Sequence, residues 1–146
     1  MQTEKEAALV SVFSLGEAMF GIDALEVQEV VRLTSLTPVH QADETIGGII
    51  NLRGQIVTVI DLARRIGMPG GERRHILIVG WGGEYIGLLV DSVTDVVAAE
   101  MDDLEPSPAN ISAEQQKFFK GVCHAASRLV AVLNLDAVLA EEIDET

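Results

Sequence analysis

Residues 9–31 read LVSVFSLGEAMFGIDALEVQEVV, and residues 75–97 read HILIVGWGGEYIGLLVDSVTDVV. A constant offset lays one stretch on the other, so that VQEVV falls on VTDVV and Gly21 falls on Gly87. Matches among Val and Ile are common, and the weight of the comparison rests on the order of the blocks and on the glycines staying in register. The chain is therefore predicted to contain an internal repeat.

The similarity resumes further along the chain, where IVTVIDL (56–62) corresponds to LVAVLNL (129–135). The order of the blocks is the same in both parts of the sequence. We therefore expect two similar halves, at about residues 9–66 and 75–139, with the same succession of structural elements.

Each half is rich in short runs of β-branched residues that end at glycine-containing turns, such as those at Gly16 and Gly82. The apolar runs 76–79 and 88–90 are too continuous for strands with one face in water. About 60 residues bury only a marginal core alone, so we expect two similar barrels that pack along an apolar seam. The predicted fold class is all-β with short helices.

Three short helices are predicted from their starting residues. Asp61 can cap a helix that ends at Ile66, and Ser112 and Gln115 have the spacing of a capping box. A last helix is expected to begin near Asp136 and to run to residue 143.

The domain organisation follows from these patterns. We expect a flexible N-terminus at residues 1–8, a single domain at 9–140 and an acidic tail at 141–146. The prolines of EPSPA (105–109) predict a loop within the second half, because each proline lacks a backbone donor.

Composition excludes several classes of partner. The 146 residues carry a formal net charge of −13, which disfavours binding to nucleic acid and to anionic lipid. No apolar run reaches the length of a membrane span and no secretion signal is visible, so we expect a cytoplasmic protein without direct membrane insertion. The free protein is expected to be monomeric. The basic residues Arg64, Arg65, Arg73 and Arg74 are either a solvated turn surface or a site for an acidic partner.

The sequence offers no convergent set of catalytic groups. His40, His75 and His124 lack the spacing of metal ligands, and the single cysteine, Cys123, is most simply a small core residue. The glycines at 80–83 precede a strand, whereas a phosphate-binding loop precedes a helix, so they predict a hairpin turn. We expect no catalytic residue, no metal and no cofactor.

Arg53 is the strongest candidate for a contact with another protein. In NLRGQIVTVIDL it precedes Gly54 at a predicted hairpin tip, beside the apolar Ile50 and Leu52. A guanidinium with five donors on a rigid strand end is suited to anchor an interface. The alternative is a solvent-exposed turn residue, with Gly54 supplying the positive φ.

The stretch GIINLRGQIVTVIDLARRIG (48–67) resembles the central signature of the CheW family of bacterial chemotaxis coupling proteins. Three further blocks resemble the other conserved parts of that family in the same order, and together the blocks cover residues 9–140. They are FSLGEAMFGIDALEVQEVVR (13–32), GLLVDSVTDVV (87–97) and FKGVCHAASRLVAVLNLDAVL (119–139).

This resemblance implies two SH3-like five-stranded β-barrels packed together and a scaffold without catalytic activity. It further implies that the protein couples the cytoplasmic tip of methyl-accepting chemoreceptors to the regulatory domain of the histidine kinase CheA, in membrane-associated arrays. Two alternatives stay open: an adaptor of a non-chemotaxis chemosensory pathway, and a small-ligand-binding β-barrel module.

The resemblance also implies which residues contact the partners. The positions that match the receptor-binding surface of the family are Arg53, Val27, Glu29 and Gly48. The positions that match kinase or receptor contacts, and that equally suit a structural role, are Ile76, Val93, Val96 and Gly121.

Overall fold

The computed structural model describes residues 7–40, 43–100, 112–125 and 128–143. Short strands make up most of this part of the chain, which confirms the all-β class. The elements, in order, are β1 (Ala7–Leu15), β2 (Ala18–Asp23), the 3-10 helix η1 (Ala24–Glu26), β3 (Val27–Arg32), β4 (Ile46–Leu52), β5 (Gln55–Asp61), α1 (Leu62–Ile66), β6 (His75–Trp81), β7 (Glu84–Val90), β8 (Ser92–Glu100), α2 (Ala113–Gln116), β9 (Phe119–Ala125), β10 (Arg128–Leu133) and α3 (Leu135–Ile143). Of the helices in the described ranges, none has the length and apolar character needed to cross a membrane.

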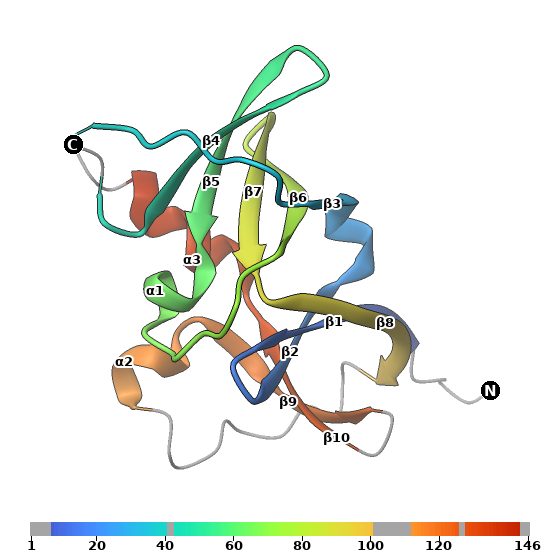
Figure 1. Cartoon of the computed structure of the whole chain (residues 1–146). Coiled ribbons are helices and arrows are strands. Elements are labelled where there is room, and N and C mark those ends of the chain that lie inside the picture. The colour runs from blue at the N-terminus through green and yellow to red at the C-terminus, as the bar shows by residue number, and fades with distance from the viewer. Residues whose placement is uncertain (1–6, 41–42, 101–111, 126–127, 144–146) are drawn as a thin grey trace.

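The strands form two five-stranded sheets, which lie one above the other in Figure 1. The lower one, sheet A, has the order β8-β1-β2-β10-β9, and the upper one, sheet B, has the order β3-β6-β7-β5-β4. Each sheet contains one parallel pair among antiparallel neighbours: β2 with β10 in sheet A and β5 with β7 in sheet B. The expected pair of packed five-stranded barrel subdomains is confirmed.

The two sheets do not coincide with the two sequence repeats. β1 and β2 of the first repeat belong to sheet A, while β3, β4 and β5 belong to sheet B; the second repeat divides in the opposite sense. The expectation that residues 9–66 and 75–139 each form one barrel half is therefore corrected: each barrel takes strands from both repeats. The chain crosses between the sheets twice, at η1 and at Asp91, the residue between β7 and β8.

The repeat itself is visible in the backbone. Gly48 in β4 and Gly121 in β9 adopt φ angles of 150° and 152°, which side-chain-bearing residues rarely adopt. Each lies beside a register shift in the ladder to the following strand. The two sheets therefore share even their local irregularities.

The core has three parts, one inside each barrel and one between them. Along β6, Ile76 and Ile78 point into barrel B, and Leu77 and Val79 point into the central cluster. This alternation confirms that the continuous apolar runs are buried on both faces. In the central cluster Phe20 stacks between Phe13 and Phe119, with ring centroids 5.9 and 5.8 Å apart.

The helix starts agree with the predicted caps. The Asp61 carboxylate accepts a hydrogen bond from the Arg64 backbone N–H (3.4 Å) at the start of α1. Ser112 and Gln115 form both hydrogen bonds of the capping box on α2, at 3.2 and 3.0 Å. α3 begins at Leu135, one residue before the expected position, and the predicted turns at Gly16 and Gly82 are present.

The domain boundaries differ slightly from those expected. β1 begins at Ala7, inside the segment assigned to the flexible N-terminus, because Ala7 and Ala8 pair with the end of β8. α3 continues to Ile143, beyond residue 140. The proline loop at 105–109 and residues 144–146 of the acidic tail lie outside the described residues.

Candidate protein-binding surface

Arg53 lies at the tip of the β4–β5 hairpin, in a two-residue turn that it forms with Gly54. Both residues have positive φ, 50° for Arg53 and 89° for Gly54, which matches the right-handed twist of the flanking strands. The Asn51 side chain accepts a hydrogen bond from the Gly54 backbone N–H at 2.8 Å and so fixes the turn. Arg53 is the only residue other than glycine with positive φ among those described. Both turn residues, not Gly54 alone, therefore depart from ordinary backbone conformation.

The Arg53 guanidinium forms an ion pair with Glu29, which projects from β3. The Nη2–Oε2 distance is 2.5 Å, and the two side chains are 71% and 30% exposed, respectively. The hydrogen bond to Glu29, and then the charge of its carboxylate, raise the pKa of Arg53 above its usual value. The turn and Glu29 together hold an exposed cation in a defined position on a strongly anionic protein.

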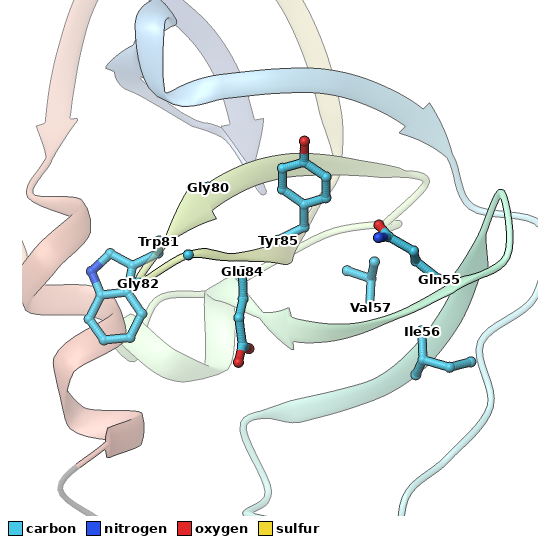
Figure 2. Close-up of a pocket in the computed structure, with 9 residues that line it drawn as sticks. Gln55, Ile56, Val57, Gly80, Trp81, Gly82, Glu84 and Tyr85 are labelled. Atoms are coloured by element: carbon cyan, nitrogen blue, oxygen red, sulfur yellow. The ribbon is translucent and has the colours of Figure 1, made fainter.

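A groove opens next to this turn, between the tips of the β4–β5 and β6–β7 hairpins. It has a volume of about 920 Å³ and is lined by residues 55–57 and 80–85. Figure 2 shows Tyr85 and Glu84 on opposite sides of β7, and Trp81 beside α3. The indole Nε1–H of Trp81 donates a hydrogen bond to the Asp136 carboxylate at 3.1 Å, which fixes one end of the groove.

Val27 and Gly48 contribute to this region through packing and backbone shape. Val27, half-buried at the start of β3, packs against the central cluster. A Cβ on Gly48 would lie 2.5 Å from the Thr37 carbonyl oxygen. The absence of a side chain allows the preceding segment to lie across β4, where Thr37 and Ile49 exchange two backbone hydrogen bonds of 2.8 and 3.0 Å.

The other four predicted contact residues lie apart from Arg53. Ile76 is 1% exposed and belongs to the core of barrel B, at the base of a second groove between β4 and the segment that follows β3. Val93, Val96 and Gly121 lie on sheet A, where Val93 packs against the central cluster and Val96 is 51% exposed. The repeat makes Val93 and Gly121 the counterparts of Val27 and Gly48, so these two pairs lie on equivalent parts of different sheets, whereas Ile76 lies on sheet B.

The three histidines lie on separate elements. His40 lies in the β3–β4 connection, His75 on β6 and His124 on β9. Within the described residues no group of three or more His, Cys, Asp or Glu side chains is suitably placed for a metal ion. Cys123 is buried inside barrel A, and this burial raises the pKa of its thiol. Its predicted role as a core residue is confirmed.

Two exposed apolar side chains near Arg53 were not identified from sequence. Ile56 and Tyr85 are 65% and 46% exposed, and both line the groove. Ile56 is followed by the buried Val57, and outward- and inward-facing residues alternate from Ile56 to Val59, so this alternation was the available signal. No comparable signal pointed to Tyr85, because it depends on how two hairpins lie side by side.

Comparison with known proteins gives a consistent result. The family model described as "CheW-like domain" matches residues 10–142. The chain is 32% identical to "Chemotaxis protein CheW" of Rhizobium meliloti (strain 1021), over 89% of this chain and 86% of that protein. It is 30% identical to "Probable chemotaxis protein CheW" of Rhizobium etli, over 91% and 88%. Its fold is similar to the crystal structure of the scaffolding protein TtCheW from Thermoanaerobacter tengcongensis, with a TM-score of 0.81, 32% identity and coverage of 95% and 92%.

Proposed function

The chain belongs to the CheW family of chemotaxis scaffold proteins, and on this basis we propose that it couples methyl-accepting chemoreceptors to the histidine kinase CheA. In this role it holds two partners in a fixed relative position and performs no chemical step. It requires no cofactor. The protein acts in the cytoplasm and reaches the membrane through the receptor array.

The observation that carries the proposal is the presentation of Arg53. Its guanidinium is exposed, and the two-residue turn and Glu29 fix its position. Arginine is enriched among residues that dominate binding energy, because its planar group can pair with a carboxylate through two parallel hydrogen bonds. In the proposed complex, Arg53 and Val27 hold the helical hairpin tip of the receptor, and Gly48 shapes the backbone of β4.

The kinase is proposed to contact sheet A. Val96 exposes an apolar side chain on β8, and Val93 and Gly121 lie on the same sheet. The support for this division is the equivalence of the two sheets, which gives the molecule two similar surfaces for two partners. Ile76 is left out of the contact surface because its side chain is buried.

The proposal is tested by co-sedimentation of the protein with receptor-bearing membranes, with and without CheA. Replacing Arg53 by Ala should weaken receptor binding about thirtyfold, which is typical for truncation of an interface hot spot. Recruitment of CheA to the membranes should fall in parallel, because the kinase reaches the receptor through this chain.

Arg74→Ala provides a matched control. Arg74 also forms an exposed ion pair, with Glu72 at 2.5 Å, but in the connection between α1 and β6. This variant should bind receptor as the wild type does. Unchanged receptor affinity in a folded Arg53→Ala protein would contradict the assignment of the receptor surface. If receptor and kinase from the same cell both fail to bind the wild-type chain, the coupling role itself is wrong.

A further inference from the structure

The two central strands of sheet B part at one end. β5 and β7 run parallel, and their ladder is paired from Thr58 with Ile86 to Asp61 with Leu89. Before Thr58 the strands separate, and the groove lined by residues 55–57 and 80–85 lies between them (Figure 2). We call this opening the β5–β7 slot.

The slot has unpaired backbone along its walls. In a two-residue hairpin the closing pair is hydrogen-bonded and the next pair is not. Leu52 with Gln55 and Trp81 with Glu84 are the closing pairs, so the backbone groups of Ile56 and Tyr85 point away from β4 and β6. The two backbone groups of Ile56 and the Tyr85 N–H face the slot without a ladder partner, whereas the Tyr85 carbonyl oxygen faces the Thr58 N–H at the first pair of the β5–β7 ladder.

The side chains at the slot are apolar or absent. Ile56 and Tyr85 are both substantially exposed, and Trp81 is fixed by its hydrogen bond to Asp136. Gly82 and Gly83 leave open space at the tip of the β6–β7 hairpin. An incoming chain therefore meets apolar surface and free backbone groups together.

The charge of the slot is negative. Glu84 is the only acidic residue among those that line the slot, and none of them is basic. Arg53, at the turn beside the slot, forms an ion pair with Glu29, so the pair as a whole carries no net charge. The slot therefore favours a basic segment over an acidic one, in keeping with the net charge of −13.

We propose that the β5–β7 slot binds an extended segment of a partner protein in which apolar residues alternate with Lys or Arg. An extended chain places alternate side chains on opposite faces. Figure 2 shows Tyr85 on one face of the slot and Glu84 and Ile56 on the other. The basic side chains lie along Ile56 and reach Glu84, while the apolar ones pack against Tyr85. The segment's backbone bonds to the free groups of Ile56. This interaction goes beyond the coupling role and does not depend on Arg53.

The first test is a titration followed by two-dimensional NMR of the backbone amides of the whole chain. The probe is an acetylated and amidated hexapeptide in which Lys and Val alternate. It should cause saturable shifts centred on Ile56, Tyr85 and Gly80–Gly83. The same peptide with Glu in place of Lys should bind about tenfold more weakly, the loss expected for one charge-assisted hydrogen bond.

The second test reverses the charge of the slot. Glu84→Lys should reverse the preference, so that the Glu-containing peptide becomes the tighter ligand. Glu17→Lys, in the exposed β1–β2 turn, makes the same change in net charge elsewhere and should leave the preference for the Lys-containing peptide in place. An equal effect of both variants, shifts spread over the surface, or no saturable shift with the first peptide would each overturn the proposal.

Discussion

Glu26 places a carboxylate at the crossing from sheet A to sheet B. It is half-buried, and its Oε1 atom is buried without a hydrogen-bond partner. Burial is the largest cause that raises the pKa of Glu26 above 4.5; Lys120 opposes this effect, and Asp23 and Asp136 add to it. The ionised form of Glu26 is therefore less favourable in the folded protein than in the unfolded chain.

Replacing Glu26 by Gln should raise the melting temperature at pH 7, because the amide carries no charge to desolvate. The pKa of Glu26 is higher in the folded protein than in the unfolded chain, so protonation of Glu26 stabilises the fold. This stabilisation is fully present below pH 4.5 and is lost as the pH rises through the raised pKa. The advantage of Glu26→Gln should thus disappear below pH 4.5. Thermal unfolding followed by circular dichroism across this range tests the prediction.

The exposed Glu17 provides the control for net charge. Glu17→Gln removes the same unit of charge from an anionic protein but should give a much smaller and less pH-dependent change. A destabilised Glu26→Gln at pH 7 would show that the carboxylate makes a favourable contact that outweighs its burial.

Gly48 is predicted to tolerate no side chain. Ala at this position would combine a disfavoured φ of 150° with a Cβ 2.5 Å from the Thr37 carbonyl oxygen. Gly48→Ala should lower the free energy of unfolding by roughly 2–4 kcal/mol. Gly82→Ala has a positive φ but open space around the new Cβ, and should cost only about 1 kcal/mol. Urea unfolding of the two variants separates the effect of the Cβ contact with Thr37 from that of the backbone strain. Equal losses of unfolding free energy in both variants would rule out an effect of the contact.

At the scale of single elements, Gln115 connects α2 to the end of α1. Its side-chain oxygen accepts a hydrogen bond from the Ser112 backbone N–H, and its amide donates to the carbonyl oxygens of Ile66 and Gly67 at 3.2 and 2.7 Å. One side chain therefore caps the beginning of one helix and the end of another, 48 residues away.

Gln115→Ala should destabilise the protein by about 1–2 kcal/mol, because both helix ends lose a partner. The end of α1 should then open more readily. The amides of Gly67 and Met68, which donate to the carbonyl oxygens of Arg64 and Ala63, should therefore exchange with solvent faster than in the wild type. Glu114→Ala, an exposed change in the same helix, should cost only a few tenths of a kcal/mol and leave that exchange unaltered. Protection of Gly67 that survives Gln115→Ala would contradict the bridging role.

Sequence was sufficient for features that depend on neighbouring residues. Asp61 and Ser112 were predicted as caps, because a cap bonds to residues two or three positions ahead. The tip position of Arg53 was predictable for the same reason, since glycine and the flanking apolar runs mark the hairpin. The Arg53–Glu29 ion pair was not predictable from local rules, because Glu29 is 24 residues away. β3 and β4 are opposite edges of sheet B, so the two side chains meet only when the sheet curves into a barrel.

At the scale of the whole molecule, the repeat predicted which strands are equivalent. It did not predict whether a strand pairs with a strand of its own repeat or of the other repeat. A β1–β2 hairpin can extend a sheet with β3 of its own repeat or with β8 of the other, and the apolar pattern is the same in both cases. The observed choice is reciprocal, so that each barrel is completed by the other repeat.

This exchange predicts that neither repeat folds alone. A fragment of residues 1–67 lacks β6 and β7, which separate β3 from β5, and lacks three strands of sheet A. Fragments 1–67 and 74–146 should each be unfolded by circular dichroism. An equimolar mixture should regain the β-sheet signal at a rate that depends on concentration. Cooperative unfolding of either fragment by itself would contradict the prediction.

The same pairing has a consequence for the order in which the protein forms during synthesis. Val10 of β1 lies beside Val97 of β8, and β2 lies beside β10, so the first hairpin to leave the ribosome finds its neighbours only near the end of translation. Sheet B has all of its strands once residue 90 has emerged, and it can form first. Until then the apolar side chains of β1 and β2 stay exposed to solvent, so we expect the nascent chain to bind chaperones.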